Sequence, residues 1–127
     1  MLNPSDLAYH LSRRARGLPF WFSLAVHGTD AYAEAMEETL GVARAVAHLV
    51  RGSAHLELVM EPDLSVVVVR RPGWGASDYA AWSEATLRDG SAFVVPSTWR
   101  GETVLRLCIV NPRTTTDAVA GVLASMA

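Results

Sequence analysis

The chain has 127 residues, a mass of 13.7 kDa and a formal net charge of −2, and half of its residues are apolar. This balance is typical of one packed domain and argues against a disordered tail or a broad basic surface for nucleic acid. All eleven basic residues are arginines, so no lysine amine is available for a Schiff base with a carbonyl compound.

Two helices are predicted at the start of the chain. Residues 13–27 form an apolar helix with Pro19 in its first turn or at a kink, and Gly28 ends it. Thr29 then caps a long amphipathic helix, in which apolar residues recur every three or four positions as far as Val50. The carboxylates of this second helix lie toward its N-terminus and its basic side chains toward its C-terminus. This arrangement matches the helix dipole and is typical of a solvent-exposed face.

The arginines at 13, 14 and 16 precede an apolar stretch, as in a twin-arginine export signal. Cleavage of such a signal would fall inside the long helix, so we favour a cytoplasmic protein. No run of about twenty apolar residues is present, which predicts no membrane span. The single cysteine, Cys108, lies in an apolar run, and we expect it to be buried as a small hydrophobic residue.

The middle of the chain predicts two strands and a helix. Residues 56–60 alternate between apolar and polar side chains, and 66–69 is a β-branched run that is apolar on both faces, so the second strand should be central. After a loop, Ser77 is expected to cap a helix that Gly90 closes.

The last third predicts two strands and a final helix. Residues 92–110 contain two strands around Arg100-Gly101, a two-residue hairpin turn. Thr114 to Thr116 then cap a helix running toward Met126. The order of elements predicts a single α/β two-layer (α+β) domain over 1–127, with a mostly antiparallel sheet of about four strands and helices packed on one face.

Arg106 interrupts the apolar pattern of its strand, where it points to the same side as Val104 and Cys108. A guanidinium among apolar neighbours needs an anion. The structural explanation is an ion pair with Glu57 or Glu102, or a side chain that snorkels to water. The functional explanation is an anion-binding site.

The sequence contains no motif of a metal site, a phosphate-binding loop or a nucleophilic serine. The four histidines lack the spacing of a metal site, so we expect no metal. Phosphate-binding glycine loops and the nucleophile elbow are also missing.

Two segments resemble a known family. Residues 93–98 read Phe-Val-Val-Pro-Ser-Thr, Gly101 follows, and 105–115 read Leu-Arg-Leu-Cys-Ile-Val-Asn-Pro-Arg-Thr-Thr. This block is similar to the C-terminal signature of the group II pyridoxal-phosphate-dependent amino-acid decarboxylases. Residues 11–21 resemble the segment that follows the cofactor domain in those enzymes, although Ala15 stands where an aromatic residue is usual.

The resemblance implies the small domain of a fold-type I enzyme, which closes over an active site made with the large domain of the same polypeptide in a homodimer. It implies that Arg106, Ser12 and Arg13 lie on the substrate side in the parent enzyme. The cofactor lysine, the aspartate at the pyridine nitrogen and the stacking histidine belong to the large domain. We therefore expect this chain alone to be inactive and to bind no pyridoxal phosphate.

The alternative is a free-standing α/β module that self-associates or binds a small ligand without catalysis. In either case the predicted helix over residues 13–27 is apolar nearly all round, so we expect it to bind a partner or to associate with a second copy of the chain. Its large apolar residues are Leu18, Phe20, Trp21, Phe22 and Leu24.

Overall fold

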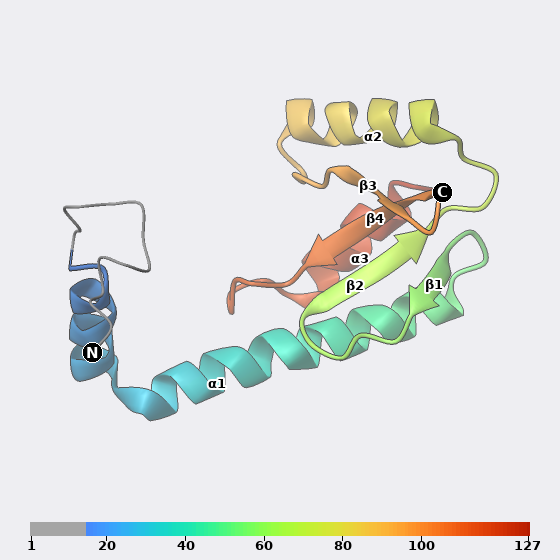
Figure 1. Cartoon of the computed structure of the whole chain (residues 1–127). Helices are drawn as coiled ribbons and strands as arrows, with labels where there is room; N and C mark the ends of the chain where they lie inside the picture. Colours follow the sequence, from blue (N-terminus) through green and yellow to red (C-terminus); the bar gives the residue numbers. More distant parts are fainter. Residues whose placement is uncertain (1–14) are drawn as a thin grey trace, which may run out of the picture. The chain divides into compact units, whose positions relative to one another are not determined.

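The computed structural model describes residues 15–127, which fall into two compact units, one up to Glu34 and one from Ala35. Seven elements follow in the predicted order (Figure 1): α1 (Gly17–Gly52), β1 (Glu57–Met60), β2 (Val66–Arg70), α2 (Ala76–Asp89), β3 (Pro96–Trp99), β4 (Glu102–Cys108) and α3 (Thr116–Ala124). The two predicted N-terminal helices are the two parts of α1.

The first unit contains the interruption of α1 at Gly28. This residue has φ of 78° and ψ of 167°, so the predicted break at Gly28 is confirmed. Pro19 lies in the first turn of α1, where a missing N–H costs no helical hydrogen bond. Across the break, the Phe20 and Tyr32 rings pack edge to face with centroids 6.1 Å apart. The predicted helix start at Arg13 lies outside the described residues.

The second unit is built on a four-stranded antiparallel sheet in the order β1-β2-β4-β3, so the predicted central position of residues 66–69 is confirmed. Trp99 pairs with Glu102 across the hairpin turn. Arg100 and Gly101 both have positive φ, at 49° and 85°, which is the conformation that a tight two-residue turn requires.

One core lies on one face of this sheet. Val67 and Val69 of β2 and Leu105 and Leu107 of β4 point toward it, and none of them is more than 5% exposed. The three helices bury their apolar residues in the same cluster: Ala43, Val46, Ala47 and Val50 of α1, Tyr79 and Trp82 of α2, and Val119 and Leu123 of α3. The predicted fold class, an antiparallel sheet with helices on one face, is therefore confirmed.

For α2 and α3, the helix caps agree with the predictions at two of three places. Gly90 ends α2 in the left-handed conformation, and the Thr115 hydroxyl accepts a hydrogen bond from the Ala118 N–H at 3.2 Å. The predicted Ser77 cap is wrong, because α2 begins earlier. Gly75 is its N-cap, and the Gly75 N–H donates to the Asp78 carboxylate at 2.7 Å.

Candidate functional site

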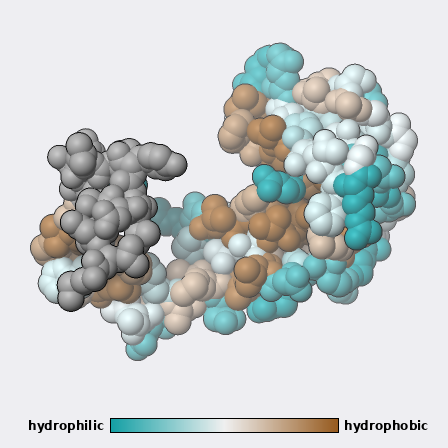
Figure 2. All heavy atoms as spheres, in the orientation of Figure 1, coloured by the Kyte–Doolittle hydropathy of each residue, from teal (hydrophilic) through white to brown (hydrophobic). Residues whose placement is uncertain are grey.

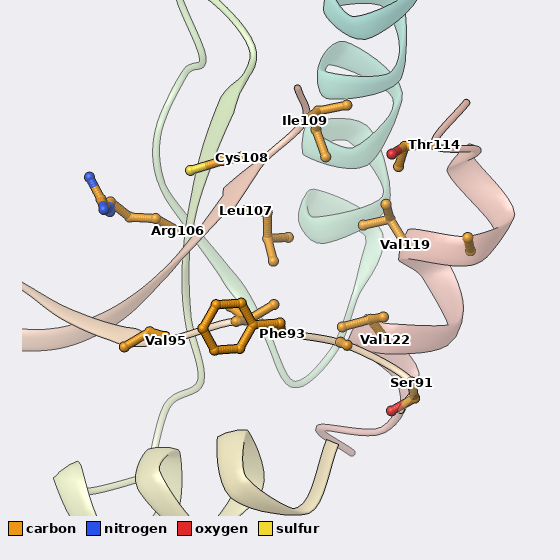
Figure 3. A pocket seen from close by; sticks show the side chains of 13 residues that line it. Ser91, Phe93, Val95, Arg106, Leu107, Cys108, Ile109, Thr114, Val119 and Val122 are labelled. Atoms are coloured by element: carbon orange, nitrogen blue, oxygen red, sulfur yellow. The ribbon is translucent and has the colours of Figure 1, made fainter. Parts of the chain in front are cut away.

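A pocket of about 440 Å³ opens beside the second half of β4 (Figure 3). Leu107 and Ile109 of the β4 region line it together with Val119 and Val122 of α3. Phe93 and its neighbours, from the segment 91–95 that precedes β3, form the opposite side. The volume falls in the range of sites that hold small ligands or short peptide segments.

The pocket exists because β3 begins later than the sequence predicted. The β-branched and aromatic residues at 92–95 favour a strand, yet β3 starts at Pro96, opposite Leu105. Contacts with α2 tie the preceding segment to that helix. The Ser83 hydroxyl donates to the Val94 carbonyl at 2.6 Å, and the Ala92 N–H donates to the Thr86 carbonyl at 3.2 Å.

The edge of β4 that faces the pocket has no strand beside it. β3 pairs only with residues 102–105, so the pairing ends before Arg106. The Ile109 N–H donates to the Ser65 carbonyl at 2.8 Å, which places the backbone groups of 105, 107 and 109 toward β2. Because successive residues of a strand direct these groups to opposite sides, those of Arg106 and Cys108 face the pocket.

Arg106 projects from the other face of the sheet, away from Leu107 (Figure 3), and its side chain is exposed. It makes no ion pair or side-chain hydrogen bond with any of residues 15–127. The two carboxylates considered as its partners both pair with Arg70 instead. Arg70 lies 3.3 Å from the Glu57 carboxylate and also contacts that of Glu102.

The ion pair with Glu57 or Glu102 is thus the wrong structural explanation for Arg106. Arg70 is directly opposite Glu57 in the register of β1 and β2, whereas Arg106 lies opposite Val68. The snorkelled side chain and the anion-binding site both remain compatible with an exposed guanidinium.

Cys108 corrects another expectation. It was predicted to be buried, but it is exposed on the same face as Arg106. Leu107 and Ile109 enter the core, while Cys108 points to the opposite face. That face is covered at Val104, which is 1% exposed, but is open at Arg106 and Cys108.

Two of the residues that line the pocket are exposed apolar side chains. Phe93 and Val95 are 74% and 57% exposed. Figure 2 shows apolar residues, in brown, among hydrophilic ones on the visible face of the second unit. Sequence reasoning missed this pocket, and its available signal was Pro96, which marks a late start of β3.

A second hollow is lined by Leu56, Leu58 and three charged residues, Arg51, Glu57 and Glu61. Arg51 forms a two-pronged contact with the Glu61 carboxylate, and this hydrogen bonding lowers the pKa of Glu61. The charges of Arg51 and Glu61 are therefore already paired with each other, and neither is free for a ligand. Within residues 15–127 no group of three or more histidine, cysteine or acidic side chains could hold a metal, and no helix in that range is long and apolar enough to cross a membrane.

Of the three predicted site residues, the structure places Arg106 alone, since Ser12 and Arg13 lie outside the described residues. Arg106 belongs to β4 and lines the pocket beside that strand. The pocket and Arg106 together form the candidate site.

No family model matches the chain, but comparison with known proteins finds amino-acid decarboxylases among its relatives in sequence and in structure. It is 29% identical over 130 residues to an aromatic-L-amino-acid decarboxylase of Bacillus atrophaeus, covering 96% of this chain and 27% of that protein. The glutamate decarboxylase domain of a Vibrio parahaemolyticus diaminobutyrate enzyme superposes with a TM-score of 0.79 and 25% identity, over 96% of this chain and 27% of that one.

A third match, Oryza sativa TDC with PLP and tryptamine, has a TM-score of 0.82 at 22% identity and covers 98% of this chain and 28% of that one. The resemblance to the small C-terminal portion of these enzymes, indicated by the motifs, is confirmed. The chain spans about a quarter of the length of the proteins that it matches.

Proposed function

We propose that this chain is the small domain of a pyridoxal-phosphate-dependent amino-acid decarboxylase, and that the parent enzyme releases the α-carboxylate of an amino acid as carbon dioxide. The observation that carries the proposal is the match of nearly the whole chain, in sequence and in fold, to one portion of such enzymes. We further propose that the parent is cytoplasmic and homodimeric, with a large domain that is not part of these 127 residues.

The residues of this chain do not fit the cofactor. Covalent attachment of pyridoxal phosphate needs a lysine amine, and the sequence contains none. We therefore assign cofactor binding and the bond-breaking chemistry to the large domain, and to this chain a role in covering the active site. Alone, it should be inactive.

We propose Arg106 as the residue of this chain nearest to the active site of the parent. Its guanidinium is exposed and makes no ion pair within residues 15–127, and Arg106 is one of the residues that line a pocket with largely apolar walls. Its planar fork suits a carboxylate, from either the substrate or a neighbouring protein group. Ser12 and Arg13 are proposed as substrate-side residues on the resemblance alone.

The direct test is to express the complete native reading frame that contains this sequence and to measure carbon dioxide release from a panel of amino acids. We expect the frame to extend upstream through a histidine-lysine segment, and the product to bind pyridoxal phosphate and decarboxylate at least one amino acid. A frame that codes for no cofactor domain would contradict the proposal and favour the free-standing module.

We predict that the isolated chain forms no covalent adduct with pyridoxal phosphate on any side chain. Borohydride reduction after incubation with the cofactor, followed by mass measurement of the peptides, checks this. The complete parent is the matched positive control, because its large domain should gain one adduct per chain. A stoichiometric adduct on a side chain of the isolated chain would contradict the assignment of the cofactor to the proposed large domain.

We also predict that the isolated chain self-associates through the start of α1. Phe20, Trp21 and Phe22 are each more than half exposed, and apolar clusters of this kind attract partners. Light scattering should report a mass above 13.7 kDa that falls toward the monomer when Phe20 and Trp21 are replaced by serine. The matched control replaces Leu87, which is 55% exposed on α2. A monomeric wild-type chain at all concentrations would refute this prediction.

A further inference from the structure

The open edge of β4 has the features of a site for an added strand. Arg106 and Cys108 pair with β2 on one side, but each directs a backbone N–H and a carbonyl to the other side, toward the pocket, where no described residue pairs with them. Backbone groups of this kind hydrogen-bond an extended peptide, which completes the ladder at a sheet edge. A compact small ligand would leave part of this alternating set of donors and acceptors unmatched.

The register of such a strand determines which side chains it needs. A residue placed opposite Arg106 points to the same face of the sheet as Arg106, and its neighbours on either side point to the other face. On that other face lie Leu107 and Ile109, with Val119 and Val122 of α3 completing an apolar wall. The neighbours should therefore be apolar.

The charge of Arg106 indicates which residue type should lie opposite it in the added strand. Arg106 makes no ion pair within residues 15–127, because Arg70 holds the carboxylates of Glu57 and Glu102. Residues directly opposite in an antiparallel ladder have Cβ atoms about 5 Å apart, within reach of an ion pair. A carboxylate opposite Arg106 would complement this guanidinium.

We propose that the open edge of β4 binds an extended segment of a partner polypeptide in which an acidic residue stands between two apolar residues. The acidic residue pairs with Arg106, and its neighbours enter the pocket against Leu107 and Val122. This goes beyond the decarboxylase proposal, because it specifies a protein carboxylate as the anion that meets Arg106. It requires neither pyridoxal phosphate nor the parent large domain, so the two proposals fail separately.

The test uses the complete 127-residue chain and a fluorescently labelled peptide, acetyl-Thr-Val-Glu-Val-Thr-amide. Fluorescence anisotropy should show saturable binding, weaker by about fivefold or more when lysine replaces the central glutamate. N-methylation of the central backbone amide should weaken binding about tenfold or more, because it removes a ladder donor. Equal affinity for all three peptides, or no saturable binding, would overturn the proposal.

Variants of the chain sharpen the test. Arg106→Glu should reverse the preference, so that the lysine peptide binds more tightly than the glutamate peptide. Ala118→Phe should abolish binding by filling the pocket from α3, whereas the matched Ala124→Phe, on the same helix but outside this pocket, should not. Circular dichroism should show that each variant is folded. If a variant does not fold, the comparison of the three peptides on the unaltered chain still tests the proposal.

Competition separates a peptide from a small ligand. Acetate and benzoate carry a carboxylate without a backbone ladder, so neither should displace the labelled peptide at millimolar concentration. Complete displacement by either anion would assign the site to small carboxylates and overturn the proposed strand addition.

Discussion

Replacing Leu105 with alanine should lower the free energy of unfolding by about 2–5 kcal/mol, the range for truncation of a large aliphatic side chain in a packed core. Leu105 is fully buried and lies opposite Val69 at the centre of the sheet. The substitution leaves a cavity that neighbouring strands, held in register on both sides of β4, fill poorly. Urea denaturation followed by circular dichroism measures the difference.

The matched control is Val110→Ala, which follows the same strand but truncates a side chain that is 76% exposed. Its effect should stay within about 0.5 kcal/mol, as for most surface substitutions. A loss below 1 kcal/mol for Leu105→Ala would contradict the central position of this side chain in the core.

The second large effect is expected in the complete parent enzyme. Arg106→Lys should lower turnover by at least about tenfold, equivalent to ~1.4 kcal/mol in the activation barrier. Lysine keeps the positive charge but loses the planar two-pronged donor that matches a carboxylate. Because Arg106 is exposed and makes no ion pair within residues 15–127, the fold and the cofactor absorbance should be unchanged.

Arg88→Lys is the matched control for that measurement. Arg88 is exposed on α2 and forms an i,i+4 pair with Glu84, a contact that lysine can replace. Turnover of this variant should equal that of the unaltered enzyme. If Arg106→Lys also retains full turnover and unchanged substrate affinity, Arg106 does not serve the active site.

Much of this fold could be predicted from the sequence because local chemistry determines it. Gly28 and Gly90 adopt positive φ where the apolar periodicity of the helices stops, and Thr115 caps α3 as its residue type favours. The turn at Arg100-Gly101 follows from glycine at a position that requires positive φ. These features depend on a few neighbouring residues.

Features that depend on distant residues could not be predicted in the same way. The strand propensity of Phe93 and Val95 yields to contacts with α2, including the hydrogen bond from Ser83 to the Val94 carbonyl. The competition between Arg70 and Arg106 for the same carboxylates is decided by the register of three strands. The exposure of Cys108 depends on which face of the sheet the helices leave open.

The two outermost strands show how this sheet avoids uncontrolled aggregation. β1 has four residues, carries Glu57 and is distorted by a register shift between Leu58 and Met60. β3 is equally short and begins with Pro96, which cannot donate a backbone hydrogen bond. Short, charged, distorted or proline-bearing edges are poor templates for amyloid-like stacking. The sheet can therefore leave a short stretch of β4 open for a specific partner without presenting a long edge on which identical chains would polymerise.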